Sequence, residues 1–117
     1  MGKEKIVSAG KLPFFSIIVP TFNSSKTIKE CISSLANLNY PKNRFEIIIS
    51  DDGSRNSEFE VLKKLRKKHD FIILRSKNSG PATARNLGME HESKHSNYTL
   101  LIDSDTKVDS KLLLEHH

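Results

Sequence analysis

Two carboxylates just past an apolar run are the residues of this chain best suited to chemistry. Asp103 and Asp105 follow Leu101-Ile102 and are separated by Ser104 alone. Residues two apart point to the same side wherever the backbone stays extended, so both carboxylates can then face one ligand. Paired oxygen ligands with room for water suit Mg²⁺ or Mn²⁺, which usually share their shell with substrate phosphates. The pair predicts a divalent-cation site, although an Asp-x-Asp on its own more often marks a surface turn.

Polar segments also follow three other apolar runs. They are Pro20-Thr21-Phe22-Asn23, Asp51-Asp52-Gly53-Ser54 and Lys77-Asn78-Ser79-Gly80. Gly80-Pro81 can open a helix, whose first backbone N–H groups and dipole favour an anion. Ligands of open parallel sheets bind beyond the carboxyl ends of the strands. Four polar segments at one rim therefore indicate a binding site rather than four unrelated turns.

The elements that must position these segments alternate between strand and helix. Apolar runs at 15–19 and 45–49 are typical of strands buried on both faces, and two further strands are expected at 71–74 and 98–102. Apolar residues recur at helical spacing between them, at Ile28, Cys31, Ile32, Leu35 and Leu38, and at Val61, Leu62 and Leu65. Pro20 should stop the first strand, and Ser57 with Glu60 should cap the second helix. The order predicts an α/β, Rossmann-like half-domain: a mostly parallel sheet of about four strands flanked by helices.

Composition is that of one globular domain. The chain has 117 residues, of which 36% are hydrophobic and 28% charged. No N-terminal stretch resembles a signal peptide, and no apolar run approaches the roughly 20 residues that span a bilayer. Cys31 is the single cysteine, so a buried thiol in a reducing, cytoplasmic compartment is expected. Residues 114–117 resemble the start of an expression tag, which leaves 1–113 as the domain.

The net charge of +5 indicates an anionic partner only weakly. Five cations lie on the second predicted helix: Lys63, Lys64, Arg66, Lys67 and Lys68. A solvated helix face is the favoured interpretation, and the alternative is contact with an anionic ligand or with an acidic membrane surface, as a peripheral protein at its cytoplasmic face. Nucleic-acid modules usually interleave aromatics with basic residues, and this pattern is missing here, so no nucleic-acid partner is expected.

Four motifs together resemble the N-terminal part of family 2 glycosyltransferases, which have a GT-A fold. In chain order they are Ile17-Ile18-Val19-Pro20-Thr21-Phe22-Asn23, Glu46-Ile47-Ile48-Ile49-Ser50-Asp51-Asp52-Gly53-Ser54, Asn78-Ser79-Gly80-Pro81-Ala82-Thr83-Ala84-Arg85-Asn86-Leu87-Gly88 and Leu101-Ile102-Asp103-Ser104-Asp105. The resemblance covers about Phe15 to Asp109. It implies the nucleotide-sugar-binding portion of an inverting enzyme that uses a nucleoside-diphosphate sugar, such as a UDP- or GDP-sugar, with Mg²⁺ or Mn²⁺.

The resemblance also implies a role for individual residues. The residues expected to bind the nucleotide sugar are Pro20, Thr21, Asn23, Asp51, Asp52, Gly80, Arg85, Asn86 and Asp103. Thr21 and Asp52 would hold the nucleobase, with Asp52 accepting a hydrogen bond from a ring N–H. Arg85 and Asn86 would line the base and diphosphate region. Asp103 would contact the ribose or a metal-bound water, and Asp105 would coordinate the metal.

The family's second half binds a glycan, lipid or protein acceptor and supplies the carboxylate base that deprotonates the acceptor hydroxyl. No residue after Asp105 matches that base, because Asp109 is better placed as a helix cap. We therefore expect donor binding without sugar transfer by residues 1–113. A sheet that stops at its fourth strand would leave an open edge, from which self-association is expected.

Other classes fit the motifs less well. A receiver-like domain that binds Mg²⁺ without catalysis needs an acidic pair after the first strand, where this chain has Pro20-Thr21. A sugar nucleotidyltransferase needs a glycine-rich, arginine-containing loop at the same place. The chain has neither G-x-G-x-x-G after that strand nor a Walker lysine motif, which argues against dinucleotide-binding and P-loop enzymes.

Overall fold

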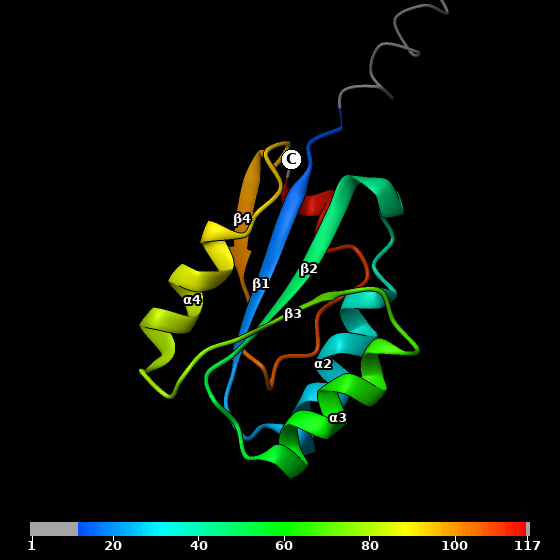
Figure 1. Cartoon of the computed structure of the whole chain (residues 1–117). Helices are drawn as coiled ribbons and strands as arrows, with labels where there is room; N and C mark the ends of the chain where they lie inside the picture. Colours follow the sequence, from blue (N-terminus) through cyan, green and yellow to red (C-terminus); the bar gives the residue numbers. More distant parts are fainter. Residues whose placement is uncertain (1–11, 117) are drawn as a thin grey trace, which may run out of the picture.

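The structure, a computed structural model, describes residues 12–116 as a sheet with helices on both sides (Figure 1). Its elements are β1 (Phe15–Thr21), α2 (Ser25–Ala36), η1 (Lys42–Arg44), β2 (Phe45–Asp51), α3 (Asn56–Arg66), β3 (Ile72–Arg75), α4 (Pro81–Glu90), β4 (Tyr98–Leu101) and η2 (Leu114–His116). The first eleven residues and His117, the last residue of the expected tag, lie outside the described residues. No helix within 12–116 is long and apolar enough to cross a bilayer. The predicted alternation of strands and helices is confirmed.

The four strands of this sheet are all parallel and lie in the order β3-β2-β1-β4. The chain moves outward from β1 to β3 and then returns to the other side of β1 to form β4. This reversal places a topological switch point between β1 and β4, where ligands of open α/β sheets bind. The expected Rossmann-like, parallel arrangement is confirmed.

The two faces of the sheet are covered differently. Helices α2 and α3 lie on one face and α4 lies on the other (Figure 1). The main core forms on the α2–α3 face, where Ile17, Val19 and Ile49 pack against Cys31 and other buried helix residues. Cys31 is thus a core residue, as its position on the apolar stripe predicts.

Helix α4 packs tightly on the opposite face because a glycine meets the sheet. A Cβ built on Gly88 would lie 2.6 Å from Cγ2 of Ile18, so any larger residue at 88 would push the helix outward. Gly88 and Ala84 are the buried residues of α4. The small residues of the third motif therefore bring the start of α4 close to the carboxyl ends of β1 and β2.

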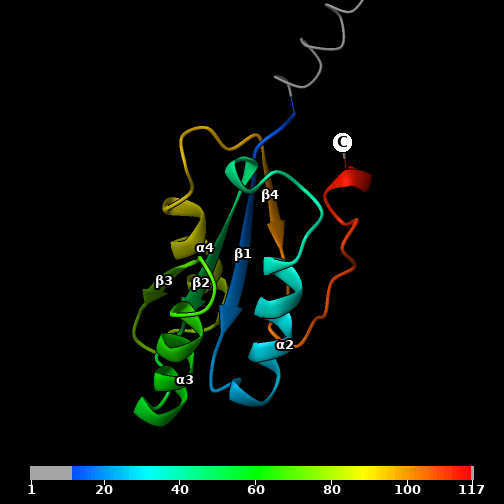
Figure 2. The ribbon, with the colours of Figure 1, turned by 90° about the vertical axis from the view of Figure 1, so that its right-hand side faces the viewer.

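The segment after β4 turns back along α2 toward the amino ends of the strands (Figure 2). The Val108 N–H donates to Ser34 Oγ of α2 (3.0 Å), and Leu113 is fully buried in the core. Burial of Leu113 ties this return segment to the domain. The 3-10 helix η2 that follows includes most of the segment interpreted as a tag.

Several element boundaries differ from the prediction. β1 continues through Pro20, because β4 ends opposite Ile18 and β1 has only β2 beside it at that level, an edge-like position that tolerates proline. The predicted capping box is wrong: α3 begins at Asn56 without a side-chain cap, and the Glu60 carboxylate pairs with Lys63 at 3.1 Å instead.

Candidate functional site

A cavity of about 900 Å³ opens at the carboxyl ends of the strands. It is lined by Pro20, Thr21, Phe22, Asn23, Ser24, Ser25, Lys26, Thr27, Asp52, Arg55, Glu58, Asn78, Gly80, Pro81, Ala84, Arg85, Asp103, Ser104 and Asp105. All four polar segments predicted from the sequence contribute to this lining. Of the residues proposed as a site, Asp51 and Asn86 do not line the cavity. Asn86 is exposed on α4.

Hydrogen bonds join the loop after β1 to the loop after β2. The Asn23 N–H donates to Ser54 Oγ (2.8 Å), and the Arg55 N–H donates to Asn23 Oδ1 (2.9 Å). Asn23 has φ of +49°, a left-handed conformation that asparagine tolerates better than most residues. The two loops therefore form one connected wall of the cavity.

Asp51 lies beneath that wall, fully buried at the end of β2. Its Oδ2 accepts the Ser54 N–H (3.0 Å), and its Oδ1 accepts the Ser54 hydroxyl (2.5 Å). The Arg75 Nε atom lies 3.5 Å from Oδ2. The side chain of Asp51 thus shapes the turn that carries Asp52, rather than facing the cavity.

Asp52 links the second loop to the third. Its carboxylate is nearly buried and accepts the N–H groups of Ser79 (2.8 Å) and Gly80 (3.0 Å). The Gly80 N–H, just before the helix start expected to favour an anion, is therefore already bonded. Within the described residues, Ala82 and Thr83 of the first turn of α4 have N–H groups without a backbone partner. The close approach of the two loops also requires Gly53, which has φ of +80° and no room for a Cβ beside the backbone nitrogen of Asn78.

The last segment forms a tight turn. The Thr106 N–H donates to the Asp103 carbonyl (3.0 Å), so the extended backbone that would point both carboxylates to the same side does not continue to Asp105. Both carboxylates are nevertheless exposed at the cavity wall. Among residues 12–116 no group of three or more His, Cys, Asp or Glu side chains gathers around one point. A cation at the Asp103–Asp105 pair would therefore need ligands from water or from a substrate.

Cys31 lies directly behind this turn. Its thiol is 3.7 Å from the carbonyl oxygen of Asp103. Burial, and secondarily the negative charge of Asp105, raises the pKa of the Cys31 thiol to about 11. Because the thiolate is the nucleophilic form, Cys31 is a structural residue rather than a nucleophile.

Sequence reasoning missed the charged residues that enter the cavity from helix starts. Lys26 lies in the first turn of α2, whereas Arg55 and Glu58 lie at the start of α3. The Glu58 carboxylate accepts the hydroxyl (2.7 Å) and N–H (3.2 Å) of Ser25, and these hydrogen bonds lower the pKa of Glu58. The order of strand, loop and helix could have indicated these residues, because a helix that follows a strand-end loop turns its first residues toward the same rim.

Relatives of known activity share both the sequence and the fold. The poly(ribitol-phosphate) beta-N-acetylglucosaminyltransferase TarS of Staphylococcus aureus strain Mu50 is 33% identical over 112 residues, which are 88% of this chain and 19% of that protein. The crystal structure of S. aureus TarS 1-349 in complex with UDP-GlcNAc matches with a TM-score of 0.79 and 33% identity, covering 88% of this chain and 30% of that one.

A more distant likeness concerns the fold alone. The mannosyltransferase PcManGT from Pyrobaculum calidifontis, solved with GDP-Man and Mn²⁺, has a TM-score of 0.69 at 23% identity over 80% of this chain and 28% of that one. The fold is thus the Rossmann-like GT-A fold of its TarS neighbours. The family model for glycosyl transferase family 2 matches residues 16–116, nearly all of the described chain. The chain belongs to glycosyl transferase family 2.

Proposed function

We propose that this domain binds the nucleoside-diphosphate sugar of an inverting glycosyltransferase, together with a divalent cation. The observation that carries the proposal is the meeting of four strand-end segments around one cavity at the switch point of the sheet. TarS, which belongs to the same family, has been crystallised with UDP-GlcNAc, so a uridine diphosphate sugar is the donor to test first. The acceptor, and the activity of a whole protein, are part of the proposal, since the chain spans only 19% of TarS.

The proposed roles follow the chemistry of the cavity wall. Thr21 and Asp52 hold the nucleobase, because the Asp52 carboxylate can accept a ring N–H in addition to the two backbone groups it already binds. Arg85 supplies a positive charge near the start of α4, where the free N–H groups also favour the diphosphate. Asn86 lies outside the cavity wall in this geometry and needs a shift of α4 to reach a ligand.

The carboxylate oxygens of Asp103 and Asp105, just after β4, are suitable ligands for a hard divalent cation. Asp103 and Asp105 are exposed carboxylates in one turn, and Mg²⁺ commonly binds through one or two carboxylates plus phosphates and water. When bound, such a cation would neutralise negative charge on the departing nucleoside diphosphate. The protein residues hold the donor in place so that its anomeric carbon faces an acceptor.

Calorimetry of UDP binding tests both the donor site and the cation. UDP is expected to bind roughly tenfold more tightly with Mn²⁺ than with a chelator, since charge-assisted contacts contribute about 1.5–3 kcal/mol. Asp105→Asn should remove most of this metal dependence, because a neutral amide is a weak cation ligand. The matched control is Asp109→Asn, which alters a carboxylate of the same return segment that lies outside the cavity wall. Equal UDP affinity with and without Mn²⁺ would contradict the cation role.

The edge of the sheet is expected to cause self-association of residues 1–117. β4 carries no charged residue, and its Tyr98 and Leu101 side chains are about half exposed (52% and 50%). Uncharged edge strands pair readily with other strands. Light scattering should detect a dimer or larger species, and Leu101→Lys should shift it toward monomer more than Met89→Lys, which changes an exposed apolar residue of α4. A monomer across a tenfold concentration range would refute the idea.

The basic residues at the carboxyl end of α3 and just after it bear on the proposed cellular setting. Lys67 and Lys68 lie beyond α3, which ends at Arg66, so the predicted helix does not carry all five cations. Lys64, Arg66, Lys67 and Lys68 are exposed and have no carboxylate within salt-bridge distance among residues 12–116. Near an acidic membrane each such cation contributes about 1 kcal/mol of attraction. A cytoplasmic protein whose basic residues are solvated is the favoured setting, and peripheral contact with an acidic membrane surface is the alternative.

A further inference from the structure

We propose that Arg75, which does not line the cavity, is a positioning residue that fixes the cavity wall formed by the loops after β1 and β2. The inference rests on the proposed function, because it assumes that the cavity binds a nucleoside diphosphate. It concerns how the loops after β1 and β2 keep the shape that such a ligand would need. Arg75 acts on those loops through Asp51 and Ser54.

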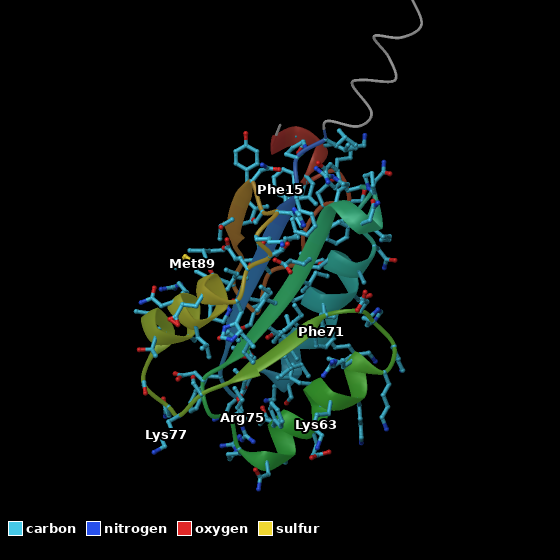
Figure 3. The ribbon with its side chains drawn as sticks, turned by 45° about the horizontal axis from the view of Figure 1, so that its top comes forward. Phe15, Lys63, Phe71, Arg75, Lys77 and Met89 are labelled. Carbon is cyan, nitrogen blue, oxygen red and sulfur yellow. The ribbon has the colours of Figure 1, made fainter. Side chains whose placement is uncertain are left out.

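Arg75 is the last residue of β3 and lies beside Asp51 of β2 in the sheet register. Its side chain makes three contacts in the space between the end of β3 and α3 (Figure 3). The Nε atom is 3.5 Å from Oδ2 of Asp51, and Nη2 donates to the Ser54 carbonyl at 2.5 Å. The guanidinium carbon lies 4.1 Å from the ring centroid of Phe59, a residue of α3. One side chain thus joins β2, the β2–α3 loop and α3.

The contacts continue from Ser54 to the cavity. The Ser54 hydroxyl donates to Asp51 and also accepts the N–H of Asn23, whose side chain accepts the N–H of Arg55. Asn23 and Arg55 both line the cavity. Four successive polar contacts therefore connect Arg75, through Asp51 and Ser54, to Asn23 and Arg55 of the cavity wall.

The charge of Arg75 is needed because Asp51 is fully buried. A buried carboxylate is costly unless an opposite charge and hydrogen bonds compensate for it. Among residues 12–116, Arg75 is the cation within 4.0 Å of Asp51. Without it, the buried carboxylate of Asp51 would lack an opposite charge, and any movement toward water would disturb the two hydrogen bonds that orient Ser54. The left-handed Asn23 would then lose the partner of its N–H.

The test compares Arg75→Met and Arg75→Lys with Arg66→Met. Arg66 is an exposed cation of α3 with no ion pair among the described residues, so its replacement removes the same charge without touching the network. If Arg75→Met leaves about a tenth of the molecules with the loops after β1 and β2 in their ligand-binding conformation, the Kd for UDP rises about tenfold. Arg75→Lys keeps the charge but loses the planar contact with Phe59, so an intermediate Kd is expected. Arg66→Met should stay within about twofold of the unmodified protein.

Amide chemical shifts separate positioning from mere stabilisation. In the unliganded protein, Arg75→Met should shift the backbone amide resonances of Asn23 and Arg55, whereas that of Asn97, bonded to Phe14 at the other end of the sheet, should not move. If Arg75→Met lowers the melting temperature but leaves these shifts and the Kd unchanged, the inference is wrong. If Arg75→Met does not fold, unchanged shifts and affinity in Arg75→Lys would overturn it equally. Should the unmodified protein bind no UDP, the proposed function fails, and the amide shifts alone then decide the role of Arg75.

Discussion

Replacing Asp52 with alanine is expected to weaken UDP binding about 100-fold, with or without a divalent cation. Asp52 is only 4% exposed, and its carboxylate accepts the N–H groups of Ser79 and Gly80 from the next loop. Alanine would remove both the proposed contact with the nucleobase and the tie that holds the third loop against the second. Hydrogen bonds to a charged group contribute about 1.5–3 kcal/mol each, so the loss of two functions corresponds to roughly a hundredfold change in affinity.

The controls for Asp52→Ala separate a local effect from unfolding. Asp52→Asn retains one carbonyl oxygen, so it should keep one loop contact and bind UDP with intermediate affinity. Asp70→Ala removes an exposed carboxylate just before β3, at the amino end of that strand, and should leave the affinity unchanged. Calorimetry measures all three, with circular dichroism to show that each variant is folded. If folded Asp52→Ala binds UDP as well as the unmodified protein, Asp52 has no part in the site.

The layers of this fold could be predicted from sequence because each element has its own hydrophobic period. β1 and β2 contain the apolar runs Ile17-Ile18-Val19 and Ile47-Ile48-Ile49, and such runs belong to strands covered on both faces. Cys31 and Leu35 follow the helical period of α2 and are fully buried. Once the strands are parallel, their carboxyl ends must share one rim, so the meeting of the polar segments follows from the connectivity alone.

The division of work between neighbouring polar residues could not be predicted. Asp51 and Asp52 are adjacent, yet one is buried beneath the turn and the other reaches the cavity, because successive side chains at the end of β2 point to opposite sides. Arg75 is far from both in sequence and meets Asp51 only through the pairing of β2 with β3. Such roles depend on long-range register and loop conformation, which local patterns do not specify.

The backbone departs from its expected conformation where contacts with other residues outweigh a local preference. Pro20 normally ends a strand, but here it sits where β1 has a neighbour on one side only. The Asp103–Asp105 pair could have continued the extended backbone of β4, but a hydrogen bond from Thr106 closes it into a turn. In both cases the backbone conformation depends on which segment lies beside the residue, and the residue type does not reveal that neighbour.

Residues 1–117 on their own are expected to show no acceptor-dependent sugar transfer. Attack on the anomeric carbon needs an acceptor hydroxyl held in place and a base within hydrogen-bond reach of its proton. The carboxylates of the described cavity wall are Asp52, Glu58, Asp103 and Asp105. Asp52 and Glu58 are held by hydrogen bonds from neighbouring segments, and those from Ser25 lower the pKa of Glu58. Asp103 and Asp105 are the proposed cation ligands, so none of the four is free to deprotonate an acceptor.

A radiolabelled nucleotide-sugar assay with a panel of acceptors tests this expectation, run beside a full-length family member. The loss of general-base catalysis alone lowers a rate by about 10²–10⁴, and the loss of acceptor positioning lowers it further. Slow hydrolysis of the donor is compatible with the expectation, because water needs less positioning than a sugar hydroxyl. Acceptor-dependent transfer at a rate near that of the full-length enzyme would mean that one of the four carboxylates is the base. Single amide variants of the four carboxylates, Asp52→Asn, Glu58→Gln, Asp103→Asn and Asp105→Asn, would then identify it, since the variant without the base should lose more transfer than its loss of donor binding explains.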